Sequence, residues 1–244
     1  MTQSPSTRDT VYQGRVILVQ PEAGFRAGFD SLALAAALPG LEAGEALELG
    51  CGSGGALLTG AFRLPGVQFT GVEQVAGIAA LAREGAGLNG YGLRVTIEKS
   101  EASAWVQGQE NRFDLVFANP PYFEPGKISA PGEGKAAAYI ESLPLEGWVK
   151  AMLHAAKPRA PVVLIHRAAE LARLLAQLDR QAGEITVLPI ASKPGEPARR
   201  VLVRARKGLK RGPLTLLAPL ITHDEDGTRS PAAQAIVEGR RIDW

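Results

Sequence analysis

The chain has 244 residues, of which 45% are hydrophobic and 21% are charged, and this composition excludes an intrinsically disordered protein. No apolar stretch approaches the ~18 to 20 residues that span a membrane, and the polar residues 1–10 lack the apolar core of a signal peptide. The single cysteine, Cys51, excludes an internal disulfide and a multi-cysteine metal site. We therefore expect a cytoplasmic protein with no membrane partner, a disordered N-terminus at 1–10 and a single domain at 11–244.

The formal net charge of +2 hides an uneven distribution of charge along the chain. Residues 1–150 hold 11 Lys and Arg against 16 Asp and Glu, whereas residues 151–244 hold 16 against 9. Within 199–211 there are seven basic residues and no acidic one, and these are Arg199, Arg200, Arg204, Arg206, Lys207, Lys210 and Arg211. Such a run is typical of a face that binds RNA or another polyanion, but also of a strand edge that charge keeps soluble.

Short apolar runs alternate along the chain with segments of helical periodicity. The runs at 45–49, 67–72, 93–98, 113–118, 162–166 and 184–190 predict strands, and the segments at 54–63, 75–89, 145–157 and 168–181 predict helices. A last alternating run at 199–206 follows a turn-rich stretch at 192–197, which predicts a hairpin. The pattern therefore predicts a doubly wound α/β domain, with a mostly parallel seven-stranded sheet and an antiparallel C-terminal strand.

A glycine loop, residues 50–55, follows the first of these strands. Glycines let the backbone approach a ligand closely, and a helix N-terminus favours negative charge. Two templates match: the dinucleotide motif through Gly50, Gly52 and Gly55, and the S-adenosylmethionine motif through Glu48, Gly50, Gly52 and Gly54. Both expect an acidic residue at the end of the next strand to bind ribose hydroxyls, and Glu73 is there. The glycine spacing alone does not decide between a dinucleotide and S-adenosylmethionine as the cofactor.

The sequence Asn119-Pro120-Pro121-Tyr122 follows the predicted strand at 113–118. Two successive prolines hold the backbone extended and remove two N–H donors. The side-chain carbonyl of Asn119 and the backbone carbonyl of Pro120 can then both accept hydrogen bonds from one planar NH₂ group, while Tyr122 offers a face for stacking. This arrangement would localise the lone pair of the amine toward an electrophilic methyl group without a strong base.

Together, residues 48–54, Glu73 and 119–122 resemble the class I methyltransferases that modify planar nitrogens, which are adenine N6, guanine N2 or a protein glutamine amide. A closer resemblance covers nearly the whole chain. Residues 25–36 are similar to the first motif of the bacterial tRNA adenine-N6 methyltransferases that act beside the anticodon of a valine tRNA, and 198–208 and 216–220 are similar to their C-terminal pattern.

The resemblance implies S-adenosyl-L-methionine as cofactor and adenine N6 of tRNA, or of another structured RNA, as the methylated group. It implies catalytic roles for Asn119, Pro120, Pro121 and Tyr122. It implies cofactor contacts from Arg26, Gly28, Asp30, Glu48, Gly50, Gly52, Gly54, Glu73, Glu101 and Asn119. At two of these positions, Glu48 and Glu101, the family usually has aspartate.

Other interpretations remain open from the sequence. A protein glutamine methyltransferase would hold an amide in the same geometry, and a nucleotide-binding module would bind without turnover. No metal is expected, because the three histidines, His154, His166 and His223, lack the spacing of metal ligands. We expect Cys51 to be a small buried filler, and Trp148 to anchor the helix that starts near residue 145.

Overall fold

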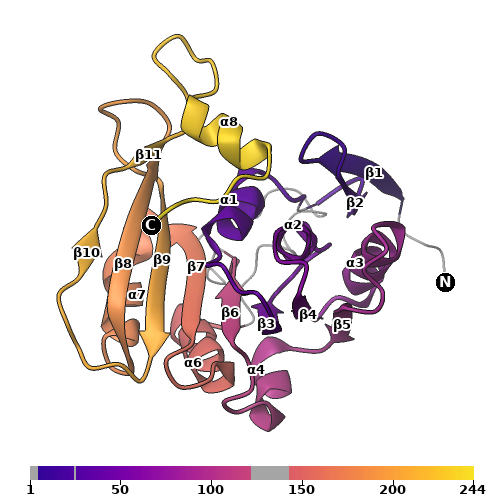
Figure 1. Cartoon of the computed structure of the whole chain (residues 1–244), viewed down its shortest axis with the longest axis horizontal. Coiled ribbons are helices and arrows are strands. Elements are labelled where there is room, and N and C mark those ends of the chain that lie inside the picture. The colour runs from indigo at the N-terminus through magenta and orange to yellow at the C-terminus, as the bar shows by residue number, and fades with distance from the viewer. Residues whose placement is uncertain (1–4, 25, 122–142) are drawn as a thin grey trace.

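A twisted, mostly parallel sheet forms the centre of the protein. The computed structural model describes residues 5–24, 26–121 and 143–244. Within them the sheet has nine strands, in the order β10-β8-β9-β7-β6-β3-β4-β5, with β11 also paired to β8 (Figure 1). The long strands are β3 (Gly44–Leu49), β4 (Val67–Glu73), β5 (Val95–Lys99), β6 (Leu115–Ala118), β7 (Pro161–Arg167), β8 (Ala182–Ala191) and β9 (Arg200–Lys207).

The direction of each strand follows the expected pattern. All neighbouring pairs from β7 to β5 are parallel, whereas β9 runs antiparallel to both β7 and β8. The prediction of seven strands with an antiparallel last strand is therefore confirmed for the long strands. Two short strands, β10 (Thr215–Leu216) and β11 (Leu220–Ile221), extend the sheet beyond β8. Two-residue strands are too short for sequence periodicity to predict them.

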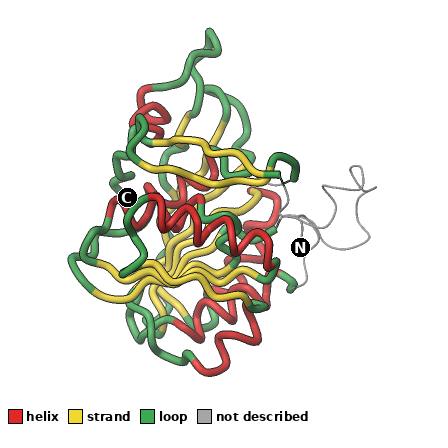
Figure 2. Tube along the Cα trace, turned by 90° about the vertical axis from the view of Figure 1, so that its right-hand side faces the viewer, coloured by secondary structure: helices red, strands yellow, loops and turns green. Residues whose placement is uncertain are grey.

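Helices cover both faces of the sheet (Figure 2). One face packs against α1 (Phe29–Ala37), α2 (Gly55–Arg63), α3 (Ala76–Leu88) and α8 (Pro231–Val237), and the other against α4 (Ala102–Trp105), α6 (Leu145–Ala155) and α7 (Leu171–Leu178). Short 3₁₀ turns, η1 (Val106–Gly108) and η2 (Ala168–Glu170), follow α4 and precede α7. Successive strand residues divide between the two cores, as Leu115 and Phe117 do on one side and Val116 and Ala118 on the other. Burial on both faces explains why the strands read as continuous apolar runs.

The start of the chain differs from the expectation. Residues 6–10, expected to be disordered, belong to β1 (Ser6–Val11), which pairs antiparallel with β2 (Val16–Pro21). The strand is polar, so its composition gave no sign of order, but the ladder with β2 satisfies its backbone. Its Asp9 also accepts a hydrogen bond from Gln20 at 2.6 Å. Residues 1–4 lie outside the described residues.

Candidate active site at the carboxyl edge of the sheet

Four of the sequence-predicted site segments meet at one edge of the sheet. Strands β3 to β7 are parallel, so their carboxyl ends share an edge. The strand order reverses at β3, because β4 and β5 lie on one side of it and β6 and β7 on the other. Ligands of open α/β sheets bind at such a reversal point. The glycine loop, Glu73, Glu101 and Asn119 follow or end β3, β4, β5 and β6 respectively.

The glycine loop depends on glycine for two different reasons. Gly50, Gly52 and Gly54 have φ values of +70°, +55° and +91°, which side chains rarely adopt. At Gly50 a Cβ atom would also lie 2.8 Å from the ring of Trp148, which is buried in α6 as expected of an anchor. At Gly52 a Cβ atom would meet nothing within 4 Å. The loop is therefore packed on its Trp148 side and open at Gly52.

Glu73, at the end of β4, is bonded to the glycine loop. Its carboxylate accepts hydrogen bonds from the backbone N–H of Gly52 at 3.1 Å and of Val75 at 2.8 Å. Burial raises the pKa of this carboxyl above its usual value, against the effect of these bonds. A carboxylate has about four lone-pair sites, and the backbone N–H of Gln74 also bonds to this one, so Glu73 keeps capacity for a further donor such as a ribose hydroxyl.

Glu48 supplies a buried carboxylate beside the same loop. The residue is 2% exposed, and its Oε2 atom has no hydrogen-bond partner among the described residues. Burial raises its pKa well above the usual value, and the nearby Glu73 raises it further. A buried polar atom without a partner is uncommon in folded proteins. Because Glu48 lines a small cavity with Gly50 and Gly52, a donor or cation of a ligand would complete its hydrogen bonding.

Asn119 and Glu48 line the same cavity. The cavity is about 20 Å³, and Ala27, Ser31, Ser53 and Ala56 are also among the residues that line it. Strand β6 places Asn119 there, since Ala118 pairs with Leu49, the residue before the glycine loop. Pro120 is buried and Pro121 is half-buried, and Tyr122 lies outside the described residues. Sequence reasoning missed Ala27 and Ser31, because small residues give no chemical signal.

Two residues of the first motif are paired with other residues of the protein. Arg26, expected to contact the cofactor, pairs with the carboxylate of Asp9 and donates to the carbonyl of Pro21 at 2.8 Å. Asp30 accepts a hydrogen bond from Arg200 at 2.9 Å and lines a second pocket. Neither is among the residues that line the cavity at the glycine loop. The bonds of Arg26 hold the segment that precedes α1, and contacts of Arg26 and Asp30 with the cofactor stay predictions.

Gly28 and Glu101 lie at helix N-termini. Gly28 is the N-cap of α1, where its carbonyl accepts a hydrogen bond from Ser31 at 3.1 Å. Glu101 is the N-cap of α4 and accepts from the N–H groups of Ser103 and Ala104, at 2.9 and 2.8 Å. Burial opposes ionisation of Glu101, but a hydrogen bond from the Ser103 hydroxyl at 2.6 Å and these backbone bonds outweigh it and lower its pKa. Contact between Glu101 and the adenine of the cofactor stays a prediction.

The structure divides the basic run 199–211 between two edges of the sheet. Arg200 pairs with Arg167 at the carboxyl edge, whereas Lys207 and Arg206 lie at the opposite edge, where Arg206 pairs with Pro161. At about 3.3 Å per residue, Arg200 and Lys207 are roughly 23 Å apart. The seven basic residues therefore do not form a single cluster, because a strand carries its two ends to opposite edges. Contact of individual members with RNA stays a prediction.

Most members of the basic run also have partners within the protein. Arg204 donates to the carbonyl of Trp244 at 2.6 Å and lies over its ring. Arg206 pairs with Glu184 at 3.2 Å and Arg211 with Asp179 at 2.9 Å. Lys207 donates to Asn111 at 2.7 Å, and Arg200 pairs with Asp30 as described above. These contacts tie β9 and the C-terminus to the rest of the fold.

The described residues contain neither a membrane-spanning helix nor a cluster of metal-ligating residues. In residues 5–24, 26–121 and 143–244, no helix is both long and apolar enough to cross a membrane. The same part of the chain contains no group of three or more His, Cys, Asp or Glu residues placed to hold a metal ion. Cys51 is a free, buried cysteine whose pKa is raised well above its usual value by burial, so it is a poor nucleophile.

Comparison with known proteins places the chain among methyltransferases. A family model for the methyltransferase small domain matches residues 26–131. The tRNA1(Val) (adenine(37)-N6)-methyltransferase of Yersinia pestis is 31% identical over 187 residues, which cover 73% of each protein. A solved structure from Agrobacterium tumefaciens, described as a predicted O-methyltransferase, is 25% identical, with a TM-score of 0.73 over 88% of this chain and 98% of that one. A tRNA methyltransferase from Aquifex aeolicus, 18% identical, shares the fold with a TM-score of 0.54 over 78% and 72% of the two chains.

The strand order, the glycine loop and the acidic residues at the carboxyl edge thus define a class I methyltransferase that uses S-adenosylmethionine. The methyltransferase interpretation of the glycine loop is confirmed over the dinucleotide one. Within this class, the chain belongs to the family that contains the tRNA1(Val) (adenine(37)-N6)-methyltransferases.

Proposed function

We propose that the protein methylates the exocyclic N6 of an adenine in RNA, and that the RNA is a tRNA in the cytoplasm. The names of the curated relatives support the adenine and the tRNA. The site supports the chemistry, because a planar amine needs hydrogen-bond acceptors rather than a strong base. The single observation that carries the proposal is the placement of Asn119 beside Glu48 and the glycine loop in one cavity.

The residues present are suited to S-adenosylmethionine. The open side of Gly52 leaves room for the cofactor to approach the backbone closely, and Glu73 keeps acceptor capacity for a ribose hydroxyl. The unpartnered Oε2 of Glu48 would pair with the ammonium of the methionine portion, which offsets the cost of a buried carboxylate. When bound, the cofactor supplies an electrophilic methyl group.

Asn119 and Pro120 would hold the amine that receives the methyl group. The side-chain carbonyl of Asn119 and the backbone carbonyl of Pro120 each accept one N–H of the adenine N6, and Pro121 removes a backbone donor that would compete. Two such bonds draw the hydrogens out of the ring plane and localise the nitrogen lone pair. Interactions that strengthen as charge develops on nitrogen accelerate the transfer.

The test combines purified protein with labelled S-adenosylmethionine and unmodified tRNA, followed by mass spectrometry of the nucleosides. We expect N6-methyladenosine as the product. Replacing Asn119 by alanine should lower turnover by on the order of 10²-fold while cofactor affinity changes little, as when one transition-state hydrogen bond is removed. A matched control is Asn111→Ala, because Asn111 is exposed and lies beside Lys207 at the opposite edge of the sheet.

The outcomes separate the remaining alternatives. Methylation of glutamine in a protein, with no change in RNA, would replace RNA by protein as substrate. Cofactor binding with no turnover on either substrate would indicate a binding module. Near-normal turnover of the Asn119→Ala variant would refute the role of the two acceptors, even if N6-methyladenosine is the product.

A further inference from the structure

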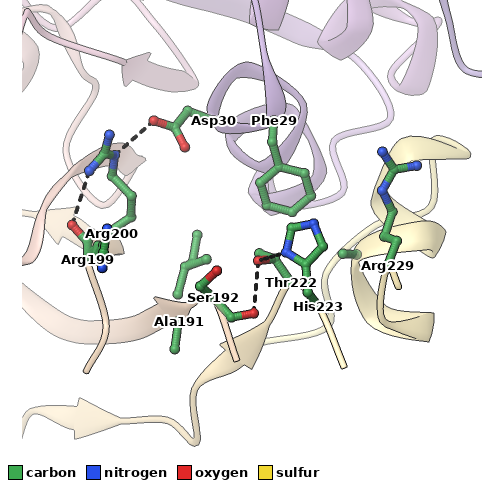
Figure 3. Close-up of a pocket in the computed structure, with 11 residues that line it drawn as sticks. Phe29, Asp30, Ala191, Ser192, Arg199, Arg200, Thr222, His223 and Arg229 are labelled. Carbon is green, nitrogen blue, oxygen red and sulfur yellow. Dashed lines mark hydrogen bonds and ion pairs between the residues drawn. The ribbon is translucent and has the colours of Figure 1, made fainter. Parts of the chain in front are cut away.

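A second pocket lies beside the cavity at the glycine loop, at the carboxyl edge of the sheet. It has a volume of about 290 Å³, close to the lower end of ligand pockets at ~300 Å³. Its walls come from the start of α1, the end of β8, the start of β9 and the segment between β11 and α8, which are far apart in the sequence (Figure 3). Figure 3 shows Arg199 and Arg200 on one side, Arg229 on the other, and Phe29 and His223 between them.

The first turn of α1 is the wall that the two cavities share. Ala27 and Ser31 line the cavity at the glycine loop, whereas Phe29 and Asp30 line the second pocket. A helix with its side chains is about 10–12 Å wide, which sets the scale of the separation between the cavities. A polymer whose reactive unit is held by Asn119, which lines the first cavity, would therefore place a neighbouring unit near the second.

The charge of the pocket favours an anion. Three arginines line it against a single aspartate, Asp30, which pairs with Arg200 at 2.9 Å. Among the described residues, Arg199 and Arg229 have no ion pair, and the guanidinium of Arg229 makes one hydrogen bond, to Gln234 at 3.2 Å. Both side chains are exposed, and the acidic turn at 224–226 does not line the pocket.

The floor of the pocket offers flat rings between these charges. Phe29 and His223 are half-buried, and a hydrogen bond of 2.9 Å between the Thr222 hydroxyl and Nδ1 holds the His223 ring. The Thr222 hydroxyl also donates to the Ser192 carbonyl at 3.3 Å. Rings of this kind stack unpaired bases of single-stranded RNA, and guanidinium groups bind its phosphates.

We propose that this pocket binds the nucleotide next to the methylated adenosine, with its base on Phe29 and His223 and its two flanking phosphates on Arg199 and Arg229. The proposal rests on RNA being the substrate. Arg200 does not bind phosphate in this proposal, because it pairs with Asp30 and so holds the start of α1 in place. The members of the basic run from Arg206 onward do not take part, because they lie at the opposite edge of the sheet. The pocket would thus fix the position, relative to the cofactor, of an RNA that has the right local sequence and shape.

The test compares two double variants that each remove two positive charges. Arg199→Gln with Arg229→Gln alters the pocket, and Lys210→Gln with Arg211→Gln alters the far end of the basic run. Affinity for the substrate RNA is measured by fluorescence anisotropy across salt concentrations, after the wild-type protein has been shown to bind and methylate that RNA. We expect the pocket variant to bind about 10- to 100-fold more weakly at 0.1 M salt and to lose roughly 1.4 to 1.8 from the log–log salt slope. The far-end control should match wild type in both.

A third variant separates stacking from charge. Phe29→Leu keeps the apolar packing but removes the flat ring, so it should weaken RNA binding and leave the salt slope unchanged. Thermal unfolding and cofactor affinity, measured for every variant, should match wild type. Equal effects of the two double variants would show diffuse attraction and overturn the pocket, as would unchanged binding in the pocket variant. Absence of RNA binding or of RNA methylation by the wild type would overturn both the proposed function and the pocket. RNA methylation by the wild type with unchanged binding in the pocket variant would overturn the pocket alone.

Discussion

Gly50→Ala and Gly52→Ala form a matched pair that should separate fold stability from cofactor binding. Both substitutions add a methyl group to the glycine loop at positive φ, which costs roughly 1 to 2 kcal/mol for a residue other than glycine. At Gly50 the new Cβ would also lie 2.8 Å from the buried Trp148 ring, and overpacking of this kind adds about 1 to 3 kcal/mol. At Gly52 there is no neighbour within 4 Å, so no packing cost is added.

These costs predict opposite patterns in two assays. Gly50→Ala should destabilise the protein by roughly 2 to 5 kcal/mol and lower the melting temperature by about 4 to 20 °C, at ~2 to 4 °C per kcal/mol for a chain of this size. Gly52→Ala should lower it by about 2 to 8 °C only. Because the methyl at Gly52 would occupy the open side of the loop, it should weaken S-adenosylmethionine binding at least ~10-fold in calorimetry.

The packing contact provides an internal control. Trp148→Phe removes the ring atoms that approach Gly50, so the cost of Gly50→Ala should be smaller in that background by about 1 kcal/mol or more. Two results would refute the reasoning. One is unchanged cofactor affinity in Gly52→Ala, which would mean that the open side of the loop does not face the cofactor, and the other is equal destabilisation by the two alanines.

Two further predictions concern acidic and titratable residues at the carboxyl edge. Replacing Glu73 by alanine should weaken S-adenosylmethionine binding by about 1 to 3 kcal/mol, because charged hydrogen bonds to ribose are lost together with those to Gly52 and Val75. Calorimetry measures the change, and an affinity equal to wild type would exclude Glu73 from the cofactor site. His166 is buried in β7, and burial, followed by the charge of Arg167, lowers its pKa from 6.5 to about 4. Its contribution to stability is therefore present above pH 6.5 and is lost as the pH falls to about 4, by at most roughly 3 kcal/mol. Urea unfolding of wild type and His166→Gln across this range should show a flatter profile in the variant, and parallel profiles would contradict the prediction.

The sheet was predictable from the sequence because its strands are buried on both faces. The seven predicted strands correspond to β3 to β9, with boundaries that shift by two residues or fewer at every end. The hairpin formed by β1 and β2 was not predicted, because it lacks such a buried, apolar pattern in its first strand. Its first strand is polar, and its order comes from a ladder with β2 and from the contact between Asp9 and Arg26, 17 residues apart.

The site was predictable where the chemistry is local and not where it depends on distant pairs. The glycine loop and Asn119 each follow a strand and Glu73 ends one, so strand direction alone brings them to one edge. The partner of Asp30 is Arg200, 170 residues away, and no local pattern indicates it. For the same reason, no single motif indicates the second pocket, because its walls come from four separate segments.

Glu48 offers a final test in which stability and binding should move in opposite directions. Burial raises the pKa of this carboxyl well above 4.5, so the folded protein holds the proton more tightly than the unfolded chain does. The stabilising contribution of the protonated carboxyl is complete below about pH 4.5 and is lost as the pH rises through the raised pKa. Glu48→Gln cannot ionise. We therefore expect the unliganded variant to be more stable than wild type at pH 8, with a difference that shrinks toward pH 4.5.

Binding of S-adenosylmethionine should reverse this order. If the Oε2 atom of Glu48 pairs with the ammonium of the methionine portion, the glutamine variant loses a charged hydrogen bond, and its affinity should fall roughly 10- to 100-fold. Thermal unfolding with and without cofactor, at pH 5 and pH 8, measures both effects in one experiment. The variant should melt higher without the cofactor and gain less from its addition. A glutamine variant that is no more stable at pH 8, yet binds the cofactor as well as wild type, would mean that the buried carboxylate faces no ligand and that Asn119 lines a cavity of another purpose.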